Sequence, residues 1–480
     1  MVVCARRRGG AGEADLKILV VTHGFPPDQM AGAEIYAFHL ARGFRARGEE
    51  VVVFSPGRRE GLEEYAVREE EVEGLRVLRM QNAFRDIHSL EDTYAHPAIE
   101  ARFAEILDRE RPDLVHLHHV IGTAAATAPL ARARGIPVVI TLHDYWFHCA
   151  RGQRITPRGH LCTRVQPWRC ALCVGKKRGR YAFDWTFAFL GGRARDAAGR
   201  GGPRRWLEFP FRGAARLLRE LTTRPIRARL GAMDRALEAA DVLLCPSEFL
   251  LERYRERGAP DRKLRFWENG METAHLEGFA REPRAPGEPI RFGFVGTLLR
   301  TKGIELLLEA FAGLDPALAR LEIHGAASGP DPAGYERRLR ARAAGHPGIR
   351  FHGRFPNAEL ARVLAGLDVL VVPSLWWENA PLTLHEAALV GMPVVTAGHG
   401  GMEEFVARFG TGVTFAPGDA ASLRAALEGL ASEPERLAGL STPRRPVRRL
   451  EDDVSGLLDL YRDLVAASAA KKSPGSPGSR

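Results

Sequence analysis

Short apolar runs alternate with helical patterns along most of the chain, and this alternation limits the folds available to it more than any other feature. The first run, at residues 16–22, stops at Gly and Pro and precedes a helical pattern at 32–47. Further strands are expected at 51–54, 75–80, 113–117, 138–142 and 242–245, with helices at 99–109 and 231–240. Strands and helices in alternation predict a parallel sheet covered on both faces.

A break rich in proline and charge, at residues 282–289, is the strongest predicted domain boundary. After it, strands are expected at 290–295, 321–324, 349–352, 369–373 and 393–396, with helices at 303–313, 335–344 and 383–390. We therefore predict an α/β protein with two tandem, Rossmann-like, doubly wound domains, at residues 16–281 and 290–450. Ligands of such sheets bind beyond the carboxyl ends of the strands, which places a site in the cleft between the domains.

The ends of the chain and its composition complete the predicted organisation. A helix at 451–468 is expected to return towards the first domain, and residues 1–15 and 469–480 are expected to be disordered. The chain has 480 residues, which suits two or three domains. No apolar run is long enough for a spanning helix, and no secretory signal is recognisable, so a cytoplasmic location is expected.

Positive charge is concentrated in one segment, residues 175–235, which we call the basic segment. It carries 16 Lys or Arg against five acidic residues, whereas the whole chain has a net charge of +10. Aromatic residues are interleaved with the cations: Tyr181, Phe183, Trp185, Phe187, Phe189, Trp206, Phe209 and Phe211. This composition favours an anionic membrane surface as partner. An insertion with a solvated Arg face and a partly buried aromatic face is the main alternative, and single-stranded nucleic acid is a weaker one.

Two glutamates, Glu378 and Glu386, lie eight positions apart after the predicted strand at 369–373. Pro381 is favoured as a first helical residue, so Glu378 is expected in the loop and Glu386 within the helix. A helix start attracts anions, which suits a diphosphate, and the carboxylates are expected to accept hydrogen bonds from hydroxyls of a ribose and a sugar. The pattern thus favours a nucleotide sugar as ligand. A surface helix with solvated glutamates would give the same spacing.

With these residues the sequence resembles the family 4 (GT4) retaining glycosyltransferases, which have the two-domain GT-B fold. Glu378 and Glu386 match the E-x7-E signature of that family, and Lys302 matches its diphosphate-binding lysine. The resemblance spans roughly residues 16–466, and its other matching segments are 31–34, 141–144, 269–272, 296–303 and 398–401 with Glu404. Two positions depart from the family pattern, since Thr297 replaces a frequent Arg and Ala31 replaces a Gly.

The resemblance implies a hexosyltransferase that moves a sugar, with retention, from a nucleoside-diphosphate sugar to a lipid-linked or polysaccharide acceptor. It implies catalytic roles for Glu378, His143 and Lys302. The donor-binding residues that it implies are Gly32, Arg300, Lys302, Asn379, Ala380, Pro381, Leu382 and Glu386. No cofactor or divalent metal is expected for catalysis. A nucleotide-sugar epimerase of the same fold, and a catalytically silent scaffold, are the alternatives.

Four cysteines, Cys149, Cys162, Cys170 and Cys173, follow the strand that ends at His143. Their C-x12-C-x7-C-x2-C spacing closes with a zinc-knuckle pair, so a structural zinc ion is one interpretation and four ordinary thiols are another, whereas the spacing gives no support to an iron–sulfur cluster. His148 and His160 are further candidate ligands. Another strand end carries three histidines, which we expect to be cleft or core residues and not ligands: His116, His118 and His119.

Overall fold

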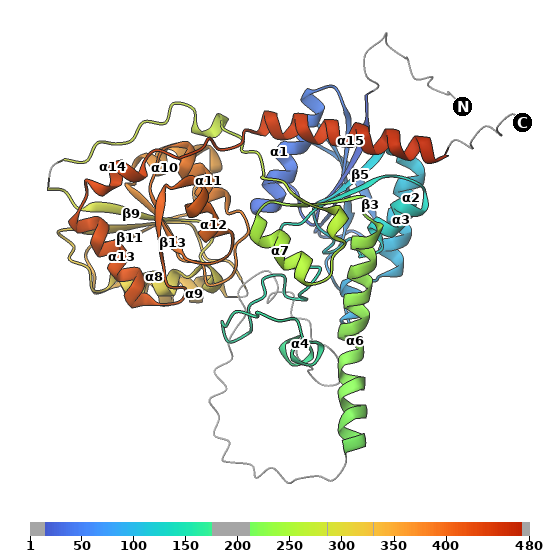
Figure 1. Cartoon of the computed structure of the whole chain (residues 1–480), viewed down its shortest axis with the longest axis horizontal. Coiled ribbons are helices and arrows are strands. Elements are labelled where there is room, and N and C mark those ends of the chain that lie inside the picture. Colours follow the sequence, from blue (N-terminus) through green and yellow to red (C-terminus); the bar gives the residue numbers. More distant parts are fainter. Residues whose placement is uncertain (1–14, 175–211, 286, 330, 473–480) are drawn as a thin grey trace, which may run out of the picture.

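A computed structural model describes residues 15–174, 212–285, 287–329 and 331–472, and it describes side chains from residue 223 onwards in the second of these ranges. Figure 1 shows two α/β bodies side by side, each built around one sheet. Residues 1–14, 175–211 and 473–480 lie outside the described residues, and they include most of the basic segment and most of the two termini expected to be disordered. None of the helices within these ranges is both long and apolar enough to cross a bilayer.

The first body contains an eight-stranded sheet with the strand order β3-β4-β2-β1-β5-β6-β7-β8. All neighbours are parallel except β3 and β4. The central strands are continuous apolar runs because both of their faces are covered. The strands are β1 (Lys17–Val21), β2 (Glu50–Gly57), β3 (Val67–Val72), β4 (Leu75–Gln81), β5 (Leu114–Leu117), β6 (Val138–Thr141), β7 (Val242–Cys245) and β8 (Leu264–Phe266).

Helices cover both faces of this sheet. They are α1 (Gly32–Ala46), α2 (Pro97–Glu110), α3 (Thr127–Ala133), α4 (Pro167–Val174), α6 (Arg212–Ala239) and α7 (Glu248–Glu256), with 3-10 turns η1 (Glu91–Thr93) and η2 (Asp261–Lys263). Helix α6 begins well before the predicted helix at 231–240. The part of α6 with described side chains, from residue 223 onwards, packs into the core through Ile226, Met233 and Leu237. The end of the basic segment, residues 223–235, is therefore amphipathic.

The second body contains a six-stranded parallel sheet with the order β11-β10-β9-β12-β13-β14. Its strands are β9 (Ile290–Val295), β10 (Ala319–His324), β11 (Ile349–Gly353), β12 (Val369–Val372), β13 (Val394–Ala397) and β14 (Gly412–Phe415). Its helices are α8 (Ile304–Phe311), α9 (Pro332–Ala343), α10 (Leu360–Ala365), α11 (Leu382–Leu389), α12 (Gly400–Phe409), α13 (Ala420–Ser432) and α14 (Arg436–Leu440), with turns η3 (Ala274–Leu276), η4 (Arg300–Lys302) and η5 (Asn357–Glu359).

The last helix, α15 (Leu450–Lys472), lies along α1 of the first body, as Figure 1 shows. Val454, Leu457 and Tyr461 are buried in the same apolar cluster as α1 and β1. The helix continues through residues 469–472, which the sequence had placed in a disordered tail. The second body is thus connected to the first through α15 as well as through the chain that follows β8.

Two features of the fold differ from the sequence-based prediction. Met271 and Leu276 already belong to the core of the second body, so the chain enters that body ahead of the predicted linker at 282–289. Strand β3 was not predicted because three of its six residues are glutamates. It is an antiparallel edge strand with alternating exposure, and charged residues are common at sheet edges because they discourage pairing with other chains.

Candidate active site

The loop after β12 passes very close to two glycines, which bring separate segments together. A Cβ atom on Gly303 would lie 1.8 Å from the carbonyl oxygen of Pro373, and Gly303 has φ of 76°. A Cβ atom on Gly401 would lie 1.6 Å from the carbonyl oxygen of Asn379, while the N–H of Gly401 donates to the carbonyl of Glu378 at 2.7 Å. Only glycine allows these approaches, so both glycines place the loop that carries Glu378.

Glu378 and Lys302 form an ion pair within this arrangement. The Nζ atom of Lys302 lies 2.6 Å from Oε1 of Glu378. The same oxygen accepts hydrogen bonds from the hydroxyl of Ser374 at 2.7 Å and the indole N–H of Trp376 at 2.9 Å. Glu378 is buried, and three donors converge on one of its oxygens, so it is held as an oriented carboxylate. Sequence reasoning brought Glu378 and Lys302 together but missed Ser374 and Trp376, which match no motif.

Two helix starts face each other across the boundary between the bodies. A Cβ atom on Gly32, at the start of α1, would lie 3.7 Å from Cδ1 of Leu382, at the start of α11. Neither helix has a side-chain cap, because Ala31 and Pro381 occupy the cap positions. Pro381 is therefore the residue before the helix and not its first residue, as had been predicted. The N-terminal ends of α1 and α11, with their free N–H groups, therefore lie close together.

Glu386 lies within α11 and is mostly buried. Its Oε1 atom is 3.4 Å from Nε2 of His275, in turn η3. The side chains of Glu386 and His275 are each 12% exposed, so a ligand can still reach them. His275 matched no sequence motif, and its position beside Glu386 depends on the chain entering the second body before η3.

His143 follows β6 and is half-buried. Its Nε2 atom is 3.0 Å from Nδ1 of His118, and Tyr36 of α1 packs edge-on against its ring. Burial is the main cause that lowers the pKa of His143 to about 3, and the charge of His119 lowers it further. The imidazole of His143 is therefore neutral near pH 7 and can donate or accept one hydrogen bond at each nitrogen.

The three histidines of β5 and its carboxyl end belong to the same buried polar cluster. His116 contacts the hydroxyls of Thr141 at 2.8 Å and Tyr461 at 2.6 Å. His119 lies 3.4 Å from the carboxylate of Asp144. Burial is the leading cause that lowers the pKa of all three: His116, His118 and His119. They are core and cleft residues, and no described set of His, Cys, Asp or Glu side chains forms a ready metal site.

Asn379 joins the Glu378 loop to the His143 segment. Its side-chain carbonyl accepts a hydrogen bond from the phenol of Tyr145 at 2.8 Å, and its amide donates to the backbone carbonyl of His143 at 2.7 Å. The predicted donor residue thus directs its side chain to the first body. Glu404 makes a second bridge, because its carboxylate accepts from the N–H groups of Glu248 and Phe249 at the start of α7.

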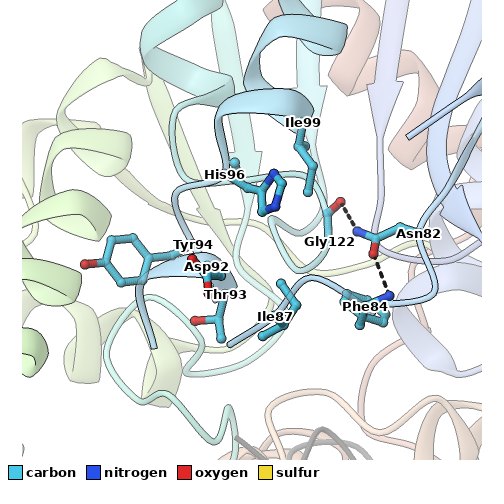
Figure 2. A pocket seen from close by; sticks show the side chains of 10 residues that line it. Asn82, Phe84, Ile87, Asp92, Thr93, Tyr94, His96, Ile99 and Gly122 are labelled. Carbon is cyan, nitrogen blue, oxygen red and sulfur yellow. Dashed lines mark hydrogen bonds between the residues drawn. The ribbon is translucent and has the colours of Figure 1, made fainter. Parts of the chain in front are cut away.

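Two hollows adjoin these elements. One lies between the bodies, and Ser247, Glu268, Asn379, Ala380 and Arg408 are among its lining residues. The other, in Figure 2, opens in the first body where β4 and β5 end. There the amide of Asn82 donates to the carbonyl of Gly122 at 3.2 Å and its carbonyl accepts from the N–H of Phe84 at 3.0 Å.

The remaining predicted residues take different positions. Arg300 is exposed in turn η4, two residues before Lys302, and Thr297 is exposed at the preceding strand end. The four clustered cysteines are free thiols, partly buried, in the segment that follows Tyr145. His148 is buried against Tyr254, with 3.9 Å between the ring centroids, and His160 is exposed.

Comparison with known proteins points to one group of enzymes. Residues 277–442 match the family model described as "Glycosyl transferases group 1", and residues 31–174 match "Glycosyl transferase 4-like domain". The chain is 27% identical over 445 residues to the glycogen synthase of Mycobacterium tuberculosis, which covers 87% of each chain. It is 33% identical over 196 residues to the D-inositol 3-phosphate glycosyltransferase of Saccharomonospora viridis, covering 38% of this chain and 44% of that protein.

Solved structures show the same fold. The sucrose-phosphate synthase of Thermosynechococcus elongatus superposes with a TM-score of 0.62 at 18% identity, over 94% of this chain and 100% of that one. HepE of Anabaena, solved in complex with UDP and glucose, superposes with a TM-score of 0.56 at 14% identity, over 95% of this chain and 98% of that one.

Proposed function

Since this chain belongs to family 4 of the glycosyltransferases and has the GT-B fold, we propose that it transfers a sugar from a nucleoside-diphosphate donor to a glycan or lipid-linked acceptor, with retention at the anomeric carbon. The observation that carries the proposal is the pairing of Lys302 with Glu378 in the loop that leads into the uncapped start of α11, which itself lies against the start of α1. Cations and helix dipoles that converge on one place suit a diphosphate. The buried carboxylates next to it suit sugar and ribose hydroxyls.

Each part of the donor has a matching element. The diphosphate lies between the starts of α1 and α11, where Lys302 can keep one N–H on Glu378 and direct its other two to phosphate oxygens. Arg300, which is exposed two residues before Lys302, supplies a second cation. It compensates for Thr297, which stands where the family often has an arginine. Glu386 accepts hydrogen bonds from the ribose diol. HepE, solved with UDP and glucose, and a starch synthase of Arabidopsis thaliana, solved with ADP and acarbose, share this fold and bind ligands of this class.

The reaction needs no protein nucleophile. The bond from the anomeric carbon to the diphosphate oxygen breaks, and the acceptor oxygen forms its new bond on the same face. The acceptor proton passes to a phosphate oxygen of the leaving diphosphate. Lys302 and the free N–H groups of α11 stabilise the charge that develops on that diphosphate. The carboxylate of Glu378 and the neutral imidazole of His143 orient the sugar.

The acceptor is expected on the first body, beside His143. The hollow in Figure 2 opens at the carboxyl ends of β4 and β5, as expected for ligand sites of parallel sheets. Phe84 and Tyr94 give it aromatic walls, and Asn82, Thr93 and His96 give it polar groups. Aromatic rings with a few hydrogen-bonding groups suit a sugar of a glycan or lipid-linked acceptor.

A donor screen tests the proposal. Purified protein is incubated with labelled UDP-, GDP- and ADP-sugars, and binding is expected for one base. Binding should be lost in Glu386→Gln and kept in the control Glu336→Gln, on α9. Product analysis by NMR should show the sugar on the acceptor with the donor's anomeric configuration. Release of free sugar without acceptor would indicate the epimerase, and an inverted linkage would contradict retention.

We also propose that the basic segment brings the enzyme to an anionic membrane surface. Residues 175–211 contain nine Lys or Arg and three acidic residues, together with the eight aromatic residues named above. In the described end of α6, Arg224, Arg227 and Arg235 are exposed. Each cation near an anionic surface contributes about 1 kcal/mol.

Flotation with vesicles tests membrane binding. The chain is expected to float with vesicles that contain phosphatidylserine and not with pure phosphatidylcholine. A variant with the nine basic residues of 175–211 changed to Gln is expected to stay at the bottom of the gradient. Equal flotation of this variant would contradict the proposal. Retention of a single-stranded oligonucleotide instead of vesicles would indicate nucleic acid as the partner.

A further inference from the structure

The four clustered cysteines lie in one small lobe, residues 149–174, that the proposed reaction does not use. Cys149 ends the turn after β6, where its N–H donates to the carbonyl of Tyr145 at 2.7 Å. Cys162 follows a short antiparallel bridge between Ile155 and Leu161, and its N–H donates to the carbonyl of Arg154 at 2.7 Å. Cys170 and Cys173 lie one turn apart on α4 and therefore on the same side of that helix.

The fold brings these three segments together. Cys149, Leu161, Cys170 and Val174 all pack against the core of the first body, and α4 lies against α6, as Figure 1 shows. Arg229 of α6 also donates to the carbonyl of Trp146, three residues before Cys149, and Arg154 donates to the carbonyl of Cys162 at 2.9 Å.

The lobe lacks an apolar core of its own. None of the eight side chains of α4, which is described throughout, is buried. Trp168 is 38% exposed and Leu172 is 75% exposed. A helix of eight residues has little stability by itself, and small units without a core commonly depend on disulfides or metals. All four thiols are free, so no disulfide stabilises the lobe.

A buried cation next to the lobe has no ion-pair partner among the described residues. Arg229 of α6 is 1% exposed, and its Nε has no hydrogen-bond partner. It stacks 4.6 Å over the ring of Trp146 and donates to the carbonyl of that residue at 2.6 Å. Burial is the main cause that lowers the pKa of Arg229 to about 10, and the charges of Cys149, Tyr94, Asp144 and Cys170 oppose this shift without any described carboxylate lying within ion-pair distance. A buried cation with no close counter-charge is unfavourable.

We propose that Cys149, Cys162, Cys170 and Cys173 bind one structural zinc ion. Four thiolates from three segments are the usual set for tetrahedral zinc, and the Cys170-x2-Cys173 pair has the usual knuckle spacing. Zinc replaces the four thiol protons and leaves a centre with net charge −2, which supplies the counter-charge for Arg229. The described side chains do not form a ready metal site in this arrangement, so zinc binding has to draw the four sulfur atoms together.

The zinc ion stabilises the acceptor side of the cleft. The lobe begins four residues after Tyr145, whose N–H donates to the carbonyl of Gly152 at 2.9 Å and whose phenol contacts Asn379. Arg154 donates to the carbonyls of Cys162 and Thr163 and lies 5.8 Å from the ring centroid of Tyr145. Four thiolates leave no open coordination position, so the ion has a structural and not a catalytic role.

Metal analysis of the full chain tests the inference independently of sugar transfer. Protein purified without chelators is expected to contain one zinc ion per chain by mass spectrometry. Cys162→Ser and Cys173→Ser are expected to lose it, whereas Cys245→Ala, in strand β7 outside the lobe, is expected to keep it. Wild-type protein without zinc, or both Ser variants with full zinc content, would overturn the assignment.

Two further measurements do not depend on the folding of the Ser variants. Wild-type protein stripped of metal is expected to bind Co²⁺ with the intense visible bands of tetrahedral thiolate coordination, and weak octahedral bands would overturn the proposal. Arg229→Met is expected to weaken zinc binding about tenfold, because groups that support the ligands commonly contribute that much, while Arg227→Met, exposed on the same helix, leaves it unchanged. Equal zinc affinity of both Arg variants would overturn the counter-charge role.

Discussion

The phenol of Tyr145 donates a 2.8 Å hydrogen bond to the side-chain carbonyl of Asn379, across 234 positions of the sequence. Asn379 also donates to the backbone of His143, so the residue after Glu378 contacts the segment of His143 and Tyr145 with both ends of its amide. This side chain thus links the Glu378 loop to the first body, in addition to the bridge that Glu404 makes to α7.

Asn379→Ala is expected to lower kcat/KM about tenfold. Two hydrogen bonds, each contributing about 0.5–1.5 kcal/mol, are lost, and 1.4 kcal/mol corresponds to a factor of ten. Steady-state kinetics measures the change, and small-angle scattering should show a larger radius of gyration. Asn357→Ala, at an exposed position of η5, is the control. If the effects of Asn379→Ala and Tyr145→Phe on kcat/KM are additive in the double variant, the two residues do not act as a pair.

Lys302→Met is expected to lower kcat by about 100-fold or more, because it removes a cation from the leaving diphosphate. Binding of the nucleotide sugar should weaken as well. Initial rates at saturating donor measure the effect on kcat, and a thermal shift with the nucleotide reports the loss of binding. Lys263→Met, on turn η2 of the first body, should leave both unchanged. A Lys302→Met enzyme with normal kcat would exclude the proposed role.

Gly401→Ala is expected to lower kcat/KM about 100-fold without unfolding the chain. The new Cβ atom would lie 1.6 Å from the carbonyl oxygen of Asn379, so the loop with Glu378 must move, and displacements near 1 Å cost about this much in rate. Circular dichroism checks the fold. At Gly345 no atom lies within 4 Å of an added Cβ, which makes Gly345→Ala the matched control. Equal rates for the two variants would contradict the account of the loop.

Acid is expected to destabilise the chain partly through His116. Burial, followed by the charge of His143, lowers the pKa of His116 to about 3, whereas a histidine in an unfolded chain titrates near 6.5. Between these values the unfolded state binds the extra proton, so the free energy of unfolding falls with falling pH, by at most about 1.4 kcal/mol per pH unit for one group. The melting temperature should drop less steeply between pH 6.5 and pH 4.5 in His116→Gln than in wild type.

The control for the pH experiment is His88→Gln, at an exposed position of the first body. It should keep the wild-type slope of melting temperature against pH. Because His116 contacts Thr141 and Tyr461, the variant is also expected to melt lower at pH 7. An unchanged slope in His116→Gln would mean that another group dominates the acid transition.

Much of the fold could be predicted because buried strands have a local signature. Strands β1, β9 and β12 are short apolar runs that end at Gly or Pro, and their burial requires that composition wherever they lie in the sheet. Strand β3 lacked this signature because its stability comes from pairing with β4 and not from its own burial. The entry into the second body near Met271 was missed for a related reason, since no break in composition marks it.

The pairing of Lys302 with Glu378 could be expected because both residues occur in recognisable motifs, although their separation in sequence gives no distance. The hydrogen bonds from Ser374 and Trp376 to Glu378, the approach of His275 to Glu386, and the bridge from Glu404 to α7 depend on packing between distant segments. No property of the single residues distinguishes them from other polar side chains.

The sequence alone determined two sheets of parallel strands, the order of their elements and the residue types available for binding a charged sugar donor, because these depend on local hydrophobic pattern and short motifs. Only the tertiary structure decided which of those residues meet. Asn379 reaches Tyr145, and Arg229 is buried against Trp146, through the close packing of segments that are far apart in the chain. Contacts of that kind arise from shape and from the pairing of buried polar groups, which a linear pattern does not encode.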